Sequence, residues 1–240
     1  MLSKSQWTKI IIGVILAAIY RVHYKLKQKR NKFTVEKIIL ETKDAFTIIL
    51  KPNKRVDFKS GQFCFLRLKK DKLYARHPFS ISSSPENENL HFTVKIKGRF
   101  TKALSELKKG DEIIVEGPFG VFNLEDKKKD LVFIAGGIGI TPFMSMIRNK
   151  LKTKEEQRII LLYCVKTKED IIFKNELDPI KEKWFKKIYI LSKEDSFYED
   201  HEKVHISKEI IKKYVEDINN SLFYICGPEP MEKLCKKELE

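Results

Sequence analysis

The chain has 240 residues, 42% of them hydrophobic, which is enough for one large or two modest folded domains and excludes an intrinsically disordered protein. Its formal net charge of +15 is unevenly distributed along the chain, because eight Lys or Arg and no acid lie within residues 1–32. The remaining excess is a mixture of lysine and acids without a basic stripe of interleaved aromatics, so no nucleic-acid partner is expected.

An uncharged run, Ile10–Tyr20, follows Trp7 and precedes a dense cluster of Lys and Arg. Eleven helical residues span about 16 Å, against about 30 Å of bilayer hydrocarbon, so the run crosses a membrane only if flanking residues such as Lys9 and Lys25 snorkel. The basic cluster predicts that the rest of the chain is cytoplasmic. Residues 1–30 are therefore interpreted as a single-pass N-terminal anchor in contact with lipid.

Two alternatives to this anchor stay open, a cleaved secretory signal and a helix lying on the membrane surface. Ala17 and Ala18 are followed directly by Ile19, Tyr20 and Arg21, which is a poor cleavage site.

Residues 31–125 have the alternating pattern of half-buried strands, as in Phe92, Val94 and Ile96. Strands are also predicted from Phe33, Ala45, Gly61, His77 and Glu112, with a helix near residues 101–108. This composition predicts a closed antiparallel barrel.

Residues 126–240 alternate apolar runs with helical stretches, a pattern typical of a doubly wound parallel sheet. Helices are predicted over residues 141–151, 170–177, 207–215 and from 229 to the end. The domain boundary is placed near residues 126–130, and ligands are expected beyond the carboxyl ends of the strands.

The loop Gly136–Pro142 joins the first of these strands to a helix. Its glycines permit close approach of the backbone to a pyrophosphate, and the helix start offers free amides, although a plain turn is the alternative. Gly98–Thr101 is a second possible anion-binding start, with Thr101 as an ordinary N-cap the alternative.

Two further segments carry polar groups in unusual places. Arg76–Pro85 combines a cation, an imidazole, an aromatic and hydroxyls within a predicted strand, and Cys226–Met231 follows the last strand. The other cysteines, Cys64, Cys164 and Cys235, lack paired spacing, so no metal site is predicted.

In order and spacing, these four motifs resemble the ferredoxin-NADP reductase superfamily, and especially the flavin and nicotinamide module of ferric reductases and NADPH oxidases. The resemblance runs from about Phe33 to the end. It implies an FAD-binding barrel followed by an NAD(P)-binding domain, and an enzyme that passes electrons from NADPH or NADH through FAD to a separate acceptor.

The resemblance also implies roles for individual residues. Ser80 would orient flavin N5 and Cys226 would lie beside the nicotinamide. The remaining implied contacts to FAD are Arg76, His77, Pro78, Phe79, Gly98, Phe100 and Thr101, and those to the coenzyme are Gly136, Gly137, Gly139, Thr141, Pro142, Gly227 and Pro228. Lys166, Ser192 and Lys193, assisted by Lys203 and His205, are candidates for a 2'-phosphate and favour NADPH.

Two departures from the family pattern stand out. His77 replaces an arginine found in many relatives, and the chain ends in a charged helix instead of an aromatic that shields the flavin. Without paired haem-binding helices, the expected acceptor is a separate membrane cytochrome, a quinone or a ferric chelate. A flavin reductase and a non-catalytic redox or nucleotide sensor are the alternative functions.

Overall fold

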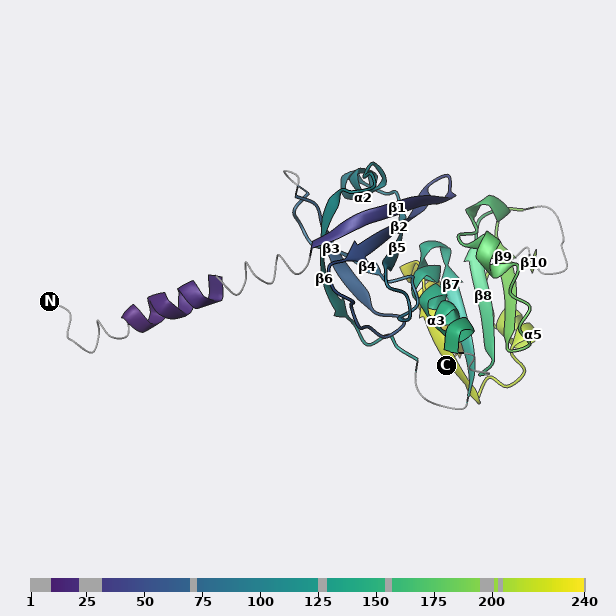
Figure 1. The fold of residues 1–240 in the computed structure, drawn as a ribbon. Helices are drawn as coiled ribbons and strands as arrows, with labels where there is room; N and C mark the ends of the chain where they lie inside the picture. The colour runs from purple at the N-terminus through teal and green to yellow at the C-terminus, as the bar shows by residue number, and fades with distance from the viewer. Residues whose placement is uncertain are drawn as a thin grey trace.

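The computed structural model describes residues 10–21, 32–69, 73–124, 129–153, 157–194, 201–202 and 205–239. Figure 1 shows two sheets side by side, with the first half of the chain in one and the second half in the other. The predicted combination of an antiparallel and a parallel domain is confirmed.

The first domain is a six-stranded antiparallel sheet in the order β4-β3-β6-β1-β2-β5. A bridge between Ile81 and Phe92 joins the two edges, which closes the sheet around an apolar core. Closure removes the free edges that an open sheet exposes. The elements are β1 (Lys32–Thr42), β2 (Ala45–Pro52), β3 (Phe63–Arg67), β4 (His77–Ser80), β5 (Leu90–Lys95), α2 (Arg99–Ser105) and β6 (Glu112–Phe119).

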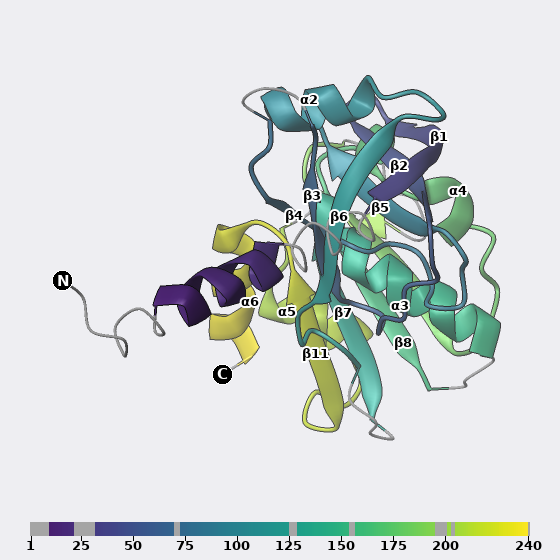
Figure 2. The same ribbon diagram turned by 60° about the vertical axis from the view of Figure 1, so that its left-hand side comes forward.

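The second domain is a five-stranded parallel sheet in the order β10-β9-β8-β7-β11. Its elements are β7 (Asp130–Gly136), η1 (Gly137–Gly139), α3 (Ile140–Thr153), β8 (Ile159–Val165), η2 (Lys168–Asp170), α4 (Lys174–Leu177), β9 (Phe185–Leu191), β10 (His201–Glu202), α5 (Lys208–Tyr214), β11 (Ser221–Cys226) and α6 (Glu229–Leu239). Helices cover both faces, with α3 and α4 on one side and α5 and α6 on the other (Figure 2).

Two predicted helices differ from the structure. The helix expected over residues 101–108 begins at Arg99 and ends at Ser105, because Gly98 is its N-cap and Thr101 lies in its first turn. The helix expected over residues 170–177 is interrupted, because Phe173 adopts a left-handed conformation with φ of 63° and only α4 follows it.

The N-terminal apolar run forms a helix over residues 10–21, and all of these residues are exposed. Within the described ranges, no helix has the length and apolar character needed to cross a bilayer. The predicted span depends on the flanking residues Trp7, Lys9 and Lys25, which lie outside the described residues.

The two domains meet where α3 packs against the segment that follows β4. Ser82, Ser83 and Ser84 of this segment are fully buried, and Met146 of α3 approaches Gly61 of the barrel domain. An alanine Cβ at Gly61 would lie 2.6 Å from the Met146 terminal methyl group and 1.9 Å from the Phe122 carbonyl oxygen. This close contact packs α3 directly against the barrel domain.

Candidate active site

A cleft of about 1020 Å³ lies between the two domains and is lined by residues from both. The parallel sheet contributes the residues at the carboxyl ends of β7, β8, β9 and β11, which is where ligands of such sheets bind. The barrel contributes Pro78, Phe79 and Ser80 of β4. The fold thus brings residues from all four sequence motifs to one cavity, since Thr101 and Cys226 line it together with Ser80 and Gly137.

The glycine loop owes much of its composition to packing against the end of β11. A Cβ on Gly139 would lie 2.1 Å from the Cys226 carbonyl oxygen, and one on Gly136 would lie 2.7 Å from the Pro228 ring. Gly137 is different, because it has a φ of +52° and nothing within 4 Å of its Cβ position. Gly137 therefore leaves open space beside the backbone, as the approach of a pyrophosphate requires.

Tyr163 hydrogen-bonds to the backbone of this loop, a role that the sequence did not indicate. Its buried hydroxyl donates to the Gly137 carbonyl at 3.0 Å and accepts from the Ile172 N–H at 3.3 Å. A tyrosine within the apolar run of β8 looks like core, and only the structure shows where its hydroxyl points.

On the barrel side, the rings of His77, Phe79 and Phe100 are stacked. Phe100 lies 3.9 Å from the His77 ring and 6.0 Å from the Phe79 ring, both at small interplanar angles. Arg76 is directed elsewhere, because it pairs with Glu116 at 2.9 Å and lies over the Phe65 ring at 4.4 Å. Neither Arg76 nor His77 is among the residues lining the cleft.

The start of α2 is held by Thr101 from its first turn, and the N-cap is Gly98 rather than Thr101 as the sequence alternative had it. Its hydroxyl accepts from the backbone N–H of Lys97 at 2.9 Å and of Gly98 at 3.1 Å. Two amides of this turn are thus already bonded within the chain. Lys95 and Lys97 also line the cleft and bring cationic groups to it, and Lys95 pairs with Asp44 at 3.0 Å.

Cys226 ends β11 and lies against the glycine loop. Burial raises the pKa of its thiol to about 11, with a further contribution from Glu232. The raised pKa favours the neutral thiol over the thiolate at physiological pH.

The cleft gathers most of the residues named from sequence and leaves out several. Those that line it are Pro78, Phe79, Ser80, Thr101, Gly136, Gly137, Gly139, Thr141, Lys166, Ser192, Cys226, Gly227 and Pro228. Those outside its lining are Arg76, His77, Gly98, Phe100, Pro142 and Lys193. His205 lines it as well, and Lys203 lies outside the described residues.

Comparisons with known proteins agree with this geometry. Residues 30–123 match the family model of FAD-binding domains, and residues 133–237 match that of oxidoreductase NAD-binding domains. The chain is 31% identical over 223 residues to the glycine betaine monooxygenase reductase subunit of Chromohalobacter salexigens, covering 88% of this chain and 60% of that relative.

Two further similarities extend over most of the chain. It is 28% identical to the plasma membrane-associated coenzyme Q6 reductase of Saccharomyces cerevisiae, covering 96% of this chain and 79% of the yeast protein. The fold matches the cytochrome b5 reductase domain of Ulva prolifera nitrate reductase with a TM-score of 0.77 and 21% identity, covering 87% of this chain and 91% of that one.

The fold, the cleft and the two matched domains define a flavin- and nicotinamide-dependent oxidoreductase. The chain belongs to the ferredoxin-NADP reductase superfamily. Its cofactor is FAD, and its co-substrate is a nicotinamide dinucleotide.

The buried thiol of Cys226 generates a testable prediction. With a pKa of about 11, Cys226 should react with iodoacetamide at pH 7.5 about 100-fold more slowly than an ordinary cysteine, because only the thiolate is nucleophilic. The rate should keep rising past pH 9. Mass spectrometry of the modified peptide measures it, with the urea-unfolded chain as control, and equal rates in the folded and unfolded chain would contradict the prediction.

Proposed function

We propose that the chain takes electrons from NADPH or NADH and passes them through FAD to a separate acceptor. The observation that carries this proposal is the single cleft lined by Ser80 of the flavin motif, Gly137 of the nucleotide loop and Cys226 after the last strand. Residues 31–125 would form the FAD-binding domain and residues 126–240 the NAD(P)-binding domain. Coenzyme Q6, named for the yeast relative, and cytochromes are examples of the class of acceptor expected.

The residues present suit the two groups. The cleft volume of about 1020 Å³ accommodates large ligands, and the open backbone at Gly137 suits a pyrophosphate. FAD supplies the redox chemistry, because it accepts a hydride from the nicotinamide and releases electrons one or two at a time. Ser80 would hydrogen-bond flavin N5, while Phe79 would pack against the flavin and exclude water.

The function is tested by purifying the full chain in detergent and recording its absorbance under anaerobic conditions. Bound flavin that bleaches with NADPH or NADH, and recovers with a quinone or a ferric chelate, would support the proposal. A colourless protein that reduces added flavin would instead indicate a flavin reductase. Bound flavin that never bleaches would indicate a sensor, and either of these two results would overturn the proposal.

Ser80→Ala tests the assignment at flavin N5. Loss of one positioned hydrogen bond should slow anaerobic flavin reduction by about 10-fold or more, while FAD stays bound through its many other contacts. Stopped-flow absorbance measures the rate. Ser105→Ala, a serine at the end of α2 outside the cleft lining, is the matched control. Reduction of Ser80→Ala at the wild-type rate would remove Ser80 from the mechanism.

The coenzyme assignment is a separate proposal. Lys166, Ser192 and His205 line the cleft, and we propose that they bind the 2'-phosphate of NADPH. Lys166→Ala should then raise the KM for NADPH about tenfold and leave that for NADH nearly unchanged, because one charged hydrogen bond is lost. Lys183→Ala, an exposed lysine outside the lining, is the control. An equal rise in the KM for NADPH and for NADH would contradict the assignment.

The N-terminal helix gives rise to a further proposal, that the chain is tethered to a membrane as a single-pass anchor with its cofactor domains in the cytoplasm. The support is an exposed apolar surface including Ile11, Ile15 and Leu16, each more than half exposed. The yeast relative, matched over 96% of this chain, is named as plasma membrane-associated.

Ile11→Asp combined with Ile15→Asp should release the full chain from the membrane fraction, because two charges on the apolar helix oppose insertion. Leu40→Asp, a 73% exposed leucine on β1, is the matched control and should stay membrane-bound. Resistance of the wild-type chain to alkaline carbonate distinguishes an anchor from a surface helix. Fractionation that is the same for the double variant and the wild type would contradict the tether.

A further inference from the structure

The contact between the two domains follows one face of α3. Ser145 donates its hydroxyl to the Ser83 carbonyl at 2.6 Å, and Lys152 donates to the Asn87 side chain at 3.0 Å. Asn149, between them, accepts from the Ser84 hydroxyl at 3.3 Å. Positions three, four and seven residues apart lie on one face of a helix, so these bonds form a line along α3. We refer to this line, with Arg148, as the α3 seam.

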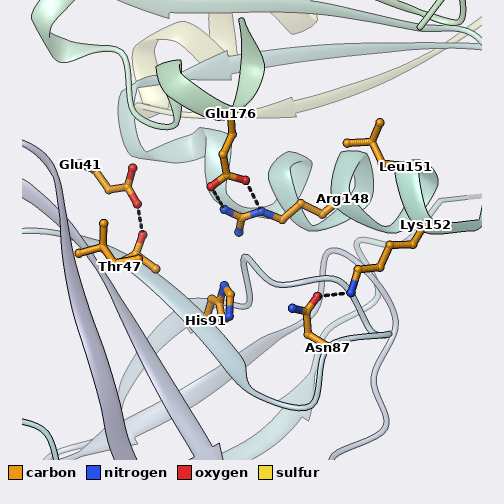
Figure 3. A pocket seen from close by; sticks show the side chains of 9 residues that line it. Glu41, Thr47, Asn87, His91, Arg148, Leu151, Lys152 and Glu176 are labelled. Carbon is orange, nitrogen blue, oxygen red and sulfur yellow. Dashed lines mark hydrogen bonds and ion pairs between the residues drawn. The ribbon is translucent and has the colours of Figure 1, made fainter. Parts of the chain in front are cut away.

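Arg148 makes the most contacts in the α3 seam. Its Nη1 donates to the Ser82 carbonyl at 2.6 Å, and its Nε donates to Glu176 of α4 at 2.9 Å. Nη2 donates to the other Glu176 oxygen, and the guanidinium lies 4.8 Å from the centre of the Phe173 ring. Figure 3 shows Arg148 held by Glu176 at the wall of a cavity between the domains. One side chain thus joins α3, α4 and the barrel domain.

The barrel end of this contact belongs to a chain of buried hydrogen bonds. Ser82 is fully buried, and its hydroxyl is 3.0 Å from that of Thr93, which is 2.8 Å from that of Thr47. Thr47 in turn donates to Glu41 at 2.5 Å. A buried chain of bonded hydroxyls fixes the position of each member, because breaking any link leaves a polar group unsatisfied.

The contact also lies close in the chain to both halves of the cleft. Ser82 is two residues after Ser80, about 7 Å along an extended backbone. Arg148 is two helical turns after Thr141 at the end of the glycine loop, about 10 Å along α3. The first path passes through the Ile81 bridge to Phe92 and the second runs along α3, so the bond from Arg148 to Ser82 links the flavin strand to the nucleotide loop by a short connection.

We propose that Arg148 is a positioning residue for hydride transfer, fixing the flavin strand at Ser80 relative to the nucleotide loop through its bond to the Ser82 carbonyl. The proposal rests on the proposed function, in which a hydride leaves nicotinamide C4, oxidising the coenzyme, and arrives at flavin N5, reducing the flavin. Such transfers are sensitive to the distance between donor and acceptor, so a displacement of about 1 Å can slow them by about 100-fold.

The test uses the full chain loaded with FAD and compares Arg148→Met with Arg158→Met. Arg158 is a matched control, because it also forms ion pairs, with Glu216 at 3.2 Å and Asp130 at 3.6 Å, but only within the nucleotide domain. Stopped-flow measurement at several coenzyme concentrations separates the limiting rate of flavin reduction from coenzyme affinity. Deuterium at nicotinamide C4 reports directly on the hydride step, which a purely structural role would not alter.

Arg148→Met should lower the limiting rate about 10- to 100-fold and increase the isotope effect, with FAD content and coenzyme affinity kept within about threefold of the wild type. Arg148→Lys should recover part of the rate, because lysine retains one donor but not the planar fork. Arg158→Met should match the wild type. If Arg148→Met does not fold, Ser145→Ala, which removes one bond of the seam, should show a smaller loss of the same kind.

Limiting rates and isotope effects of both folded seam variants within twofold of the wild type would overturn the proposal, as would a loss explained entirely by lower FAD content. Failure of the proposed function is distinct, because the wild-type chain would then show no flavin reduction. In that case, amide hydrogen exchange of Arg148→Met compared with the wild type tests the positioning role without any flavin reduction. Faster amide exchange in both residues 80–85 and 136–142 of Arg148→Met would still support the positioning role of Arg148. Unchanged exchange in these segments would overturn it.

Discussion

The structure depends on the buried polar contact between α3 and the serines that follow β4. Ser82, Ser83 and Ser84 are fully buried, so their carbonyls and hydroxyls need partners within the protein. Ser145 and Arg148 supply donors to two of these carbonyls at 2.6 Å. Because those donors belong to the other domain, satisfying the serines requires the two domains to hold one relative position. This fixed relative position of the domains determines the shape of the cleft between them.

A second constraint acts within the nucleotide domain. β7 and β11 are neighbouring parallel strands, so the glycine loop and the turn after Cys226 emerge side by side. Gly136 and Gly139 permit their contact, since a Cβ at either would lie within 3 Å of residues 226–231. Gly137, supported by the Tyr163 hydroxyl, remains open toward the cleft. The loop therefore uses Gly136 and Gly139 for packing, while Gly137 leaves the backbone open toward the cleft.

The fold could be predicted from sequence because strand alternation in one half and buried apolar runs in the other are direct consequences of which faces are covered. The helix predicted over residues 170–177 begins only after Phe173, because the left-handed backbone angle of one residue leaves no periodic signal in the sequence. Ser80 and Gly137 were expected at the site and do line the cleft, because the sequence motif around each residue sets its local backbone. Arg76 and Tyr163 could not be placed, because their contacts with Glu116 and the Gly137 carbonyl join segments distant in sequence. The seam residues were missed for the same reason.

The central claim is that this arrangement delivers a hydride directly from the nicotinamide to the flavin across the cleft. The most direct measurement is anaerobic flavin reduction of the wild-type chain by coenzyme deuterated on one or the other face of C4. The account predicts a primary isotope effect for deuterium on one face only, because the fixed domains present a single face of the nicotinamide to the flavin. Reduction without an isotope effect on either face, or with equal transfer from both, would contradict it.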